Sequence, residues 1–254
     1  MKHNKILNLF LAVTLAVSMV TGCGDSNTTP SEKASQKEAT ENVSEATESN
    51  ATDDETTAKQ LLNDLTGSYQ ELWPVILDDK YEQIWLDNCK ELVGEDNAEA
   101  AYNKLASMVS GEIYGEEAVE TYTDGNGVYD CHFTEGVSKL EFDGETSTIK
   151  GYDADDNEVF SHTYHYIGKE EIRGLYEYES DDADSGEFTY FCIAPDTSAT
   201  TYHIELRYGS DLEALGKYDA GNYAYWLSSG ISTTYDQAMV ENCIKLFCTE
   251  NLSE

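Results

Sequence analysis

Positive charge is scarce in this chain, and that scarcity excludes one class of function. The sequence has 15 lysine and arginine residues against 50 aspartate and glutamate residues, and its formal net charge is -35. Proteins bind nucleic acids through basic surfaces that meet the phosphates. A nucleic-acid partner is therefore excluded, and direct contact with anionic lipid headgroups is not expected. The acidic surface is compatible with cation capture but selects no function by itself.

Catalytic motifs are absent as well. The sequence contains no Gly-x-Ser-x-Gly elbow, no phosphate-binding loop, no Gly-rich dinucleotide turn and no His-Glu-x-x-His helix. Paired carboxylates are frequent, but among 50 acidic residues such pairs occur by chance. We predict that the protein has no catalytic activity.

Long hydrophobic runs are missing too. The apolar stretch from Ile6 to Val20 is shorter than the roughly 20 residues that a membrane-spanning helix needs. Lys2 and Lys5 precede it, and the segment VTGC that ends at Cys23 resembles a lipobox, where bacterial lipoproteins are acylated and cut. This pattern predicts a lipoprotein signal peptide over residues 1–22 and a lipid on Cys23 that anchors the protein outside the cell membrane. The alternative is an ordinary secretory signal in which Cys23 is incidental.

Aromatic residues are lacking from the first part of the mature chain. Between Gly24 and Ala58 the only large aliphatic residue is Val43, and Ser, Thr, Asn, Ala and Glu predominate. Such a composition cannot offset the conformational entropy that folding costs. We therefore predict that residues 23–58 comprise the lipidated cysteine and a disordered acidic tether with a reach of about 30 Å. Residues 59–254 follow as one domain, long enough to bury a core.

Cysteine pairs with the spacing of a zinc or redox motif are also absent. Five cysteines follow Cys23, an odd number without any Cys-x-x-Cys pair. We interpret most of them as small buried hydrophobic residues and leave one disulfide open. They are Cys89, Cys131, Cys192, Cys243 and Cys248.

The sequence does contain a block of short strands between helical regions. Residues 59 to about 110 repeat Leu, Ile and Trp at helical spacing, and a last helix is expected after Thr233 or Thr234. Between them lie seven segments rich in Val, Ile, Thr, Tyr and Phe, separated by turn residues. This pattern predicts a mainly β fold with flanking helices, an antiparallel barrel or sandwich. The expected strands are Val128–Phe133, Val137–Phe142, Thr146–Tyr152, Val159–Ile167, Ile172–Tyr178, Phe188–Ala194 and Thr200–Tyr208.

Five segments carry a resemblance to a known family through their common order and spacing. They are Gly67 to Pro74, Tyr164 to Gly168, Ile193 to Pro195, His203 to Gly209 and Asn222 to Tyr225. Together they resemble the ZinT family of extracytoplasmic zinc-binding proteins over about residues 65–231.

The resemblance implies both a fold and a role. The family fold is a calycin-like, or lipocalin-like, antiparallel β-barrel with flanking helices. Its members bind zinc through three histidines near the barrel mouth and are similar to accessory proteins that pass zinc to the binding protein of an ABC importer. In this chain the His-x-His of the family falls on His203-Ile204-Glu205, and the third histidine falls near Phe191.

These departures leave two matched ligands. Residues two apart in a strand point to the same face, so His203 and Glu205 can reach one ion. Imidazole and carboxylate together suit zinc. A third ligand has to come from elsewhere, and His162 is the first candidate because it shares a strand face with Tyr164 and Tyr166, which are expected to point inward.

The remaining histidines are expected to be structural. His165 points to the opposite face from His162, and His132 flanks Cys131 on an expected strand. For both we expect an exposed or hydrogen-bonded role rather than metal ligation.

Two functions of different classes follow. The first is a surface-anchored metal-binding lipoprotein, with zinc as the expected metal, that assists metal acquisition by an ABC importer. The alternative is a calycin-like binding module that has lost its metal site. Such a module binds a small apolar ligand in a cavity lined by some of the 18 tyrosines, or acts as a surface interaction protein.

Overall fold

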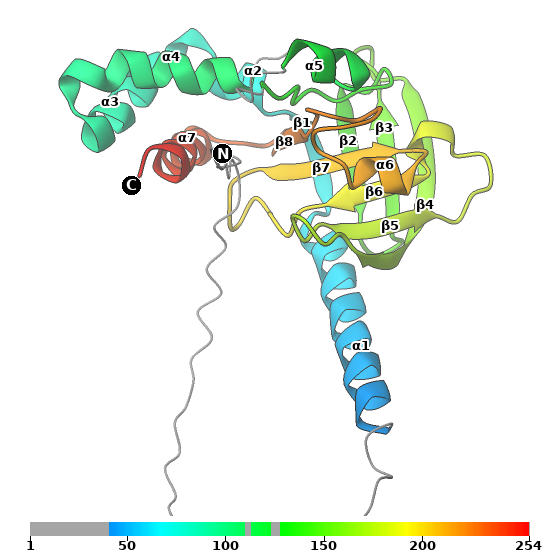
Figure 1. Ribbon diagram of the computed structural model, residues 1–254. Helices are drawn as coiled ribbons and strands as arrows, with labels where there is room; N and C mark the ends of the chain where they lie inside the picture. The colour runs from blue at the N-terminus through cyan, green and yellow to red at the C-terminus, as the bar shows by residue number, and fades with distance from the viewer. Residues whose placement is uncertain (1–40, 110–112, 123–127, 254) are drawn as a thin grey trace, which may run out of the picture.

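The computed structural model describes residues 41–109, 113–122 and 128–253, with side chains from residue 53 onward. Figure 1 shows a barrel of strands beside a layer of helices. The strands are β1 (Gly67–Glu71), β2 (Lys139–Asp143), β3 (Thr148–Tyr152), β4 (Glu158–Lys169), β5 (Tyr176–Ser180), β6 (Tyr190–Ile193), β7 (Ile204–Gly209) and β8 (Ser228–Ser232). The α-helices are α1 (Glu41–Asp64), α2 (Trp73–Ile76), α3 (Glu82–Val93), α4 (Ala98–Met108), α5 (Glu116–Thr121), α6 (Leu212–Leu215) and α7 (Gln237–Leu252). Short 3-10 helices occur at Asp79–Tyr81, Glu95–Asn97 and Gly186–Phe188.

The eight strands form a closed barrel in sequence order. Each strand pairs antiparallel with the next, and β1 closes the barrel by pairing with β8, where Gln70 faces Ile231. The predicted antiparallel barrel with flanking helices is therefore confirmed. None of the helices within the described ranges combines the length and the apolar composition that crossing a membrane requires.

One predicted strand is wrong, and two strands of the barrel were not predicted. The segment Val128–Phe133 is not a strand, and its one ladder contact is an isolated bridge between Asp130 and Trp226. The strands β1 and β8 were not predicted, because Gly-Ser-Tyr-Gln-Glu and Ser-Ser-Gly-Ile-Ser lack the alternation of large apolar and polar residues that marks a half-buried strand. In β8 four of the five residues are buried.

The helix α1 replaces part of the segment predicted to be disordered. It begins at Glu41 rather than near Lys59, and its last turns are anchored on the barrel. Ala58, Leu61 and Leu62 are buried in the barrel core, and the Tyr178 hydroxyl donates a hydrogen bond of 2.8 Å to the Ala58 carbonyl. The barrel thus supplies the apolar contacts that composition alone did not reveal. The predicted signal peptide, Cys23 and the first part of the tether lie outside the described residues.

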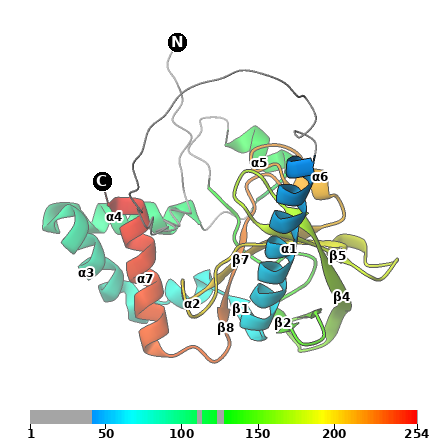
Figure 2. The same ribbon diagram turned by 90° about the horizontal axis from the view of Figure 1, so that it is seen from below.

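The protein has two hydrophobic cores separated by the barrel wall. The first fills the barrel and includes Tyr164, Phe191, Leu206 and Tyr208. The second lies between the outside of the barrel and the helices α2, α3, α4 and α7, which Figures 1 and 2 place together on one side of the barrel. Its largest members are Trp73, Trp85 and Phe247.

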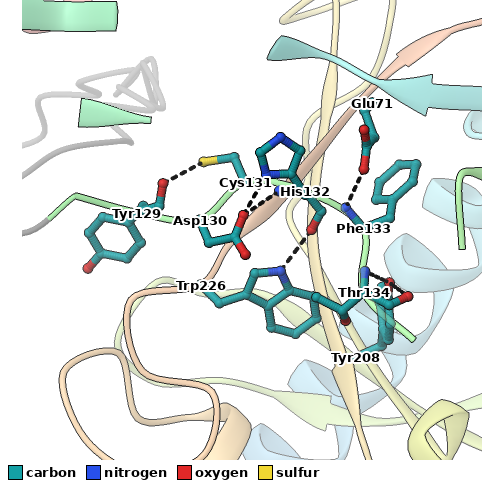
Figure 3. Close-up of polar contacts among 9 residues, drawn as sticks. All are labelled: Glu71, Tyr129, Asp130, Cys131, His132, Phe133, Thr134, Tyr208 and Trp226. Atoms are coloured by element: carbon teal, nitrogen blue, oxygen red, sulfur yellow. Dashed lines mark hydrogen bonds and ion pairs between the residues drawn. The ribbon is translucent and has the colours of Figure 1, made fainter. Parts of the chain in front are cut away.

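The irregular segment 129–134 connects the two cores. Its Phe133 is buried in the barrel core and its Cys131 in the helical core. Backbone hydrogen bonds link Asp130 and Cys131 to residues 225–229, and side chains hold the part that follows (Figure 3). The side-chain contacts are Trp226 Nε1 to the His132 carbonyl at 2.9 Å, the Phe133 amide to Glu71 Oε1 at 3.0 Å and the Thr134 amide to the Tyr208 hydroxyl at 2.6 Å.

Arg207 anchors the chain after β7 to the barrel. Its side chain is fully buried on the outer face of β7, where the guanidinium donates to the carbonyls of Leu215, Lys217 and Tyr223. The ring of Tyr218 lies 4.4 Å from the guanidinium carbon. A planar fork of donors suits this arrangement of three carbonyls better than a single ammonium does.

We expect Arg207→Lys to destabilise the protein although the charge is kept. At least one buried carbonyl loses its donor, which predicts a loss of about 2–4 kcal/mol in the free energy of unfolding. Denaturant titration followed by circular dichroism measures it. The control is Lys217→Ala, since the Lys217 side chain is exposed and pairs with the exposed Glu213. Equal stability of Arg207→Lys and the parent would contradict the assigned role.

Candidate functional site: a pocket between the barrel wall and the helical layer

His203 and Glu205 lie on the outer face of the barrel wall. In β7 the residues Ile204, Leu206 and Tyr208 point into the barrel core, so the alternate positions point out toward the helices. There a small pocket of about 10 Å³ is enclosed between β7, α2 and α7. Its lining residues are Leu72, Trp73, Ile76, His203, Glu205, Cys243, Phe247 and Glu250.

The His203 ring is oriented by the backbone two residues before it. Its Nδ1 lies 2.7 Å from the Thr201 carbonyl oxygen, which can only accept a hydrogen bond, so Nδ1 carries a proton. The other ring nitrogen, Nε2, lies 3.5 Å from Glu205 Oε1. The two side chains are 13% and 7% exposed. The carbonyl fixes the ring and leaves Nε2 directed at Glu205. Metal-binding histidines are commonly oriented in the same way, by a carbonyl that accepts a hydrogen bond from the nitrogen that does not bind the metal.

Two residues of α7 bring further donors to this pocket. Cys243 Sγ lies 3.9 Å from His203 Nδ1, and Glu250 lines the same pocket. Together with Phe247 they occupy positions i, i+4 and i+7 of α7, which form one helix face. The pocket is therefore lined by nitrogen, oxygen and sulfur donors, all of which are zinc ligands in proteins.

Burial and mutual charge shift the pKa values around this pocket. Burial opposes the charge on His203, but Cys243 and then Glu205 outweigh it and hold the pKa of His203 well above its ordinary value. Desolvation and the charge of Glu205 raise the pKa of Asp196 to about 6, against the opposing charge of His203. Desolvation also raises the pKa of Glu250. The pocket is thus a local concentration of negative charge around one imidazole.

The expectation that His162 shares a site with His203 and Glu205 is not met. His162 faces Ile149 on β3 and lies between Phe160 and Tyr164, so it points to the inside of the barrel as predicted. Its Nδ1 lies 2.8 Å from Asp182 Oδ2. His203 and Glu205 point to the outside, so the barrel wall separates them from His162. Within the described ranges no three histidine, cysteine or acidic side chains are placed to hold a metal ion together.

The other two histidines have structural partners. His165 is half exposed on β4, and its Nδ1 lies 2.7 Å from Asp181 Oδ1. His132 Nδ1 lies 2.7 Å from Asp130 Oδ1 (Figure 3). Both fit the hydrogen-bonded roles expected for them.

Sequence reasoning missed the contributions of α7. Cys243 was interpreted as a buried hydrophobic residue and Glu250 was not singled out. The i, i+4, i+7 spacing of Cys243, Phe247 and Glu250 was the available signal. It could not be interpreted without knowing which face of α7 meets β7.

The interior of the barrel is filled by aromatic side chains packed on one another. The ring centroids of Phe160 and Phe188 are 3.9 Å apart, and those of Phe191 and Tyr208 are 5.1 Å apart. The Tyr208 ring also meets the Trp226 ring edge-on at 5.0 Å. The position where the family's third histidine was expected, Phe191, belongs to this apolar cluster.

Comparisons with known proteins concern the fold. No family model and no curated protein matches the chain. Among solved structures, the Zn(II)-bound ZinT-like domain of Streptococcus pneumoniae AdcA is similar at 16% identity, with a TM-score of 0.46, covering 72% of this chain and 89% of that domain. Zn(II)-bound AdcA from the same organism is similar at 16% identity with a TM-score of 0.43. That comparison covers 76% of this chain but only 35% of AdcA. The family named there is the one whose motifs the sequence resembles.

We expect the stability of the metal-free protein to fall as the pH rises above neutrality. A raised pKa means that folded His203 holds its proton more tightly than the unfolded chain does. Its contribution is therefore complete below the ordinary histidine pKa of about 6.5 and is lost as the pH rises through the folded value. Denaturant titrations at several pH values measure this slope, which His203→Gln should reduce.

The control for this measurement is His165→Gln, because His165 is exposed and lies outside the pocket. It should leave the slope unchanged. A slope that persists undiminished in His203→Gln would show that other groups cause it.

Proposed function

We propose that the protein binds one zinc ion in the pocket between β7 and α7. The observation that carries this proposal is the pairing of His203 Nε2 with Glu205 Oε1 at 3.5 Å, in a pocket that Cys243 and Glu250 also line. Imidazole, carboxylate and thiolate are the three common zinc ligands. The Thr201 carbonyl accepts the hydrogen bond from Nδ1 that orients such an imidazole.

The side chains of this pocket are of the types that bind zinc. In this proposal the side chains of α7 complete the set of ligands when the ion binds. His203 and Glu205 are fixed on the barrel wall, and Cys243 and Glu250 are on α7, which packs against that wall through Phe247. A pocket of about 10 Å³ has room for one ion or one water molecule. Two fixed ligands with others from a separate helix suit a protein that both binds and releases its metal.

We further propose that this zinc is cargo for a membrane importer. The VTGC segment supports lipid anchoring through Cys23, on the extracytoplasmic face of a bacterial membrane. The resemblance to ZinT supports delivery of zinc to the binding protein of an ABC importer, as a binding role without catalysis. The alternative of an apolar ligand in the barrel gains no support, because the interior rings pack on one another.

We expect the metal-stripped protein to bind one zinc ion with a dissociation constant below about 1 μM. Replacing His203 with Ala removes a ligand, so the affinity should fall by more than the roughly 10–100-fold that loss of an outer-shell partner costs. Competition with a chromophoric chelator measures both constants. Glu205→Gln should weaken binding in the same direction.

The matched control is His162→Ala, because His162 is also paired with a carboxylate but points into the barrel. It should leave the zinc affinity unchanged. Only weak binding, unaffected by His203→Ala, would refute the proposed site.

We expect Cys23→Ala to release the protein from the membrane. Without the thiol no lipid can be attached. When the variant is expressed in a bacterium, it should therefore be found in the soluble fraction rather than in the membrane fraction that detergent extracts. Fractionation followed by immunoblotting measures the distribution. The control is Cys192→Ala, which removes a buried thiol of β6. Membrane association that survives Cys23→Ala would exclude a lipid on Cys23 as the anchor, whatever the outcome of the zinc titration.

A further inference from the structure

Two thiols face each other in the helical layer. Cys89 of α3 and Cys248 of α7 are both fully buried, and their Sγ atoms are 3.9 Å apart. They are 159 positions apart in the sequence. Neither residue lines the pocket of His203 and Glu205. The zinc proposal therefore leaves this pair unexplained.

The packing around the two thiols holds them in this position. Phe247, the neighbour of Cys248, meets the Trp85 ring edge-on at 5.7 Å and the Trp73 ring at 4.8 Å. Trp85 is one helical turn before Cys89, and its Nε1 donates a hydrogen bond of 2.7 Å to the Ile76 carbonyl. The helices α3 and α7 are thus held against each other by rings next to the thiols.

We propose that Cys89 and Cys248 are a disulfide site that links α3 to α7 when the protein meets a disulfide oxidant. The sulfur atoms have to approach from 3.9 Å to about 2.05 Å for the bond to form. This inference does not depend on zinc binding.

The reaction is a thiol–disulfide exchange with a small or protein disulfide such as oxidised glutathione. One cysteine thiolate attacks the oxidant, forms a mixed disulfide and releases one thiol. The thiolate of the second cysteine then attacks the protein sulfur of the mixed disulfide. The mixed disulfide bond breaks, the Cys89–Cys248 bond forms, and a second thiol is released. Two protein thiols are oxidised, one oxidant disulfide is reduced, and the two protons end on the released thiols.

Burial determines when this exchange happens. Desolvation raises the pKa values of both thiols, so few thiolates exist in the folded protein. Oxidation is therefore expected to be fast during folding and slow once the helical layer has closed. The link would close a long loop and restrict the unfolded chain.

The test uses the full chain with Cys23→Ala, so that only the five cysteines of the described part can pair. The protein is refolded from denaturant in a glutathione buffer with excess oxidised glutathione, free thiols are alkylated, and peptides are mapped by mass spectrometry. The expected result is one dominant cross-linked peptide joining Cys89 to Cys248. The oxidised protein should also unfold at a higher denaturant concentration than the reduced protein, and this shift should vanish in Cys248→Ala.

Cys192→Ala is the matched control, since Cys192 is equally buried but lies in β6 within the barrel. It should retain the cross-link and the shift. Alkylation of both Cys89 and Cys248 after refolding, or a dominant peptide joining any other pair, would overturn the proposal. If Cys248→Ala fails to fold, the peptide maps of the parent and of Cys192→Ala decide the question.

Discussion

The rest of the structure depends on the burial of both faces of β7. Its six residues are all buried, because Ile204, Leu206 and Tyr208 fill the barrel, Glu205 meets the helical layer outside, and Arg207 meets the chain that follows β7. A strand alternates its side chains between two faces, so two cores can be built on one strand only if the outward residues also find partners. Arg207 finds three carbonyls, and Glu205 finds His203. The candidate site is therefore part of the way in which the barrel and the helical layer are joined.

The strands that could be predicted are rich in large aliphatic and aromatic residues. In β4 the inward Phe160 and Tyr164 alternate with exposed residues, and the sequence shows this as period two. The strands β1 and β8 consist mostly of small and polar residues, so they carry no such alternation. The segment 129–134 has the composition of a strand but is held by side chains and by a few backbone hydrogen bonds to residues 225–229, which no local pattern reveals. Composition and period therefore identify strands with large side chains, and they miss strands of small and polar residues.

The same argument explains which part of the site could be predicted. His203 and Glu205 were paired correctly, because their relation is local and follows from alternation along one strand. His162 was assigned correctly to the inside of its own strand, but the relation between two distant strands depends on which face of each is the inside. The contribution of α7 depends in turn on how that helix is rotated against β7. Contacts between distant elements depend on how each strand or helix is oriented relative to the other. Composition and spacing along the sequence do not specify that orientation.

A polar cluster at the junction of two layers has an energetic consequence. The buried Glu205 carboxylate needs a partner that offsets its desolvation. That partner, His203, is on the same barrel wall, while Cys243 and Glu250 belong to α7. Any cation that neutralises the negative charge of this pocket therefore also strengthens the contact between α7 and the barrel. Conversely, loosening α7 weakens the hold on the cation without disturbing the barrel.

Coupling of this kind is reciprocal, so a partner that displaces α7 would lower cation affinity by the same free energy with which the cation opposes the displacement. If the proposed ion binds at the layer junction, movement of α7 offers a route for its release that a site enclosed in the barrel interior lacks.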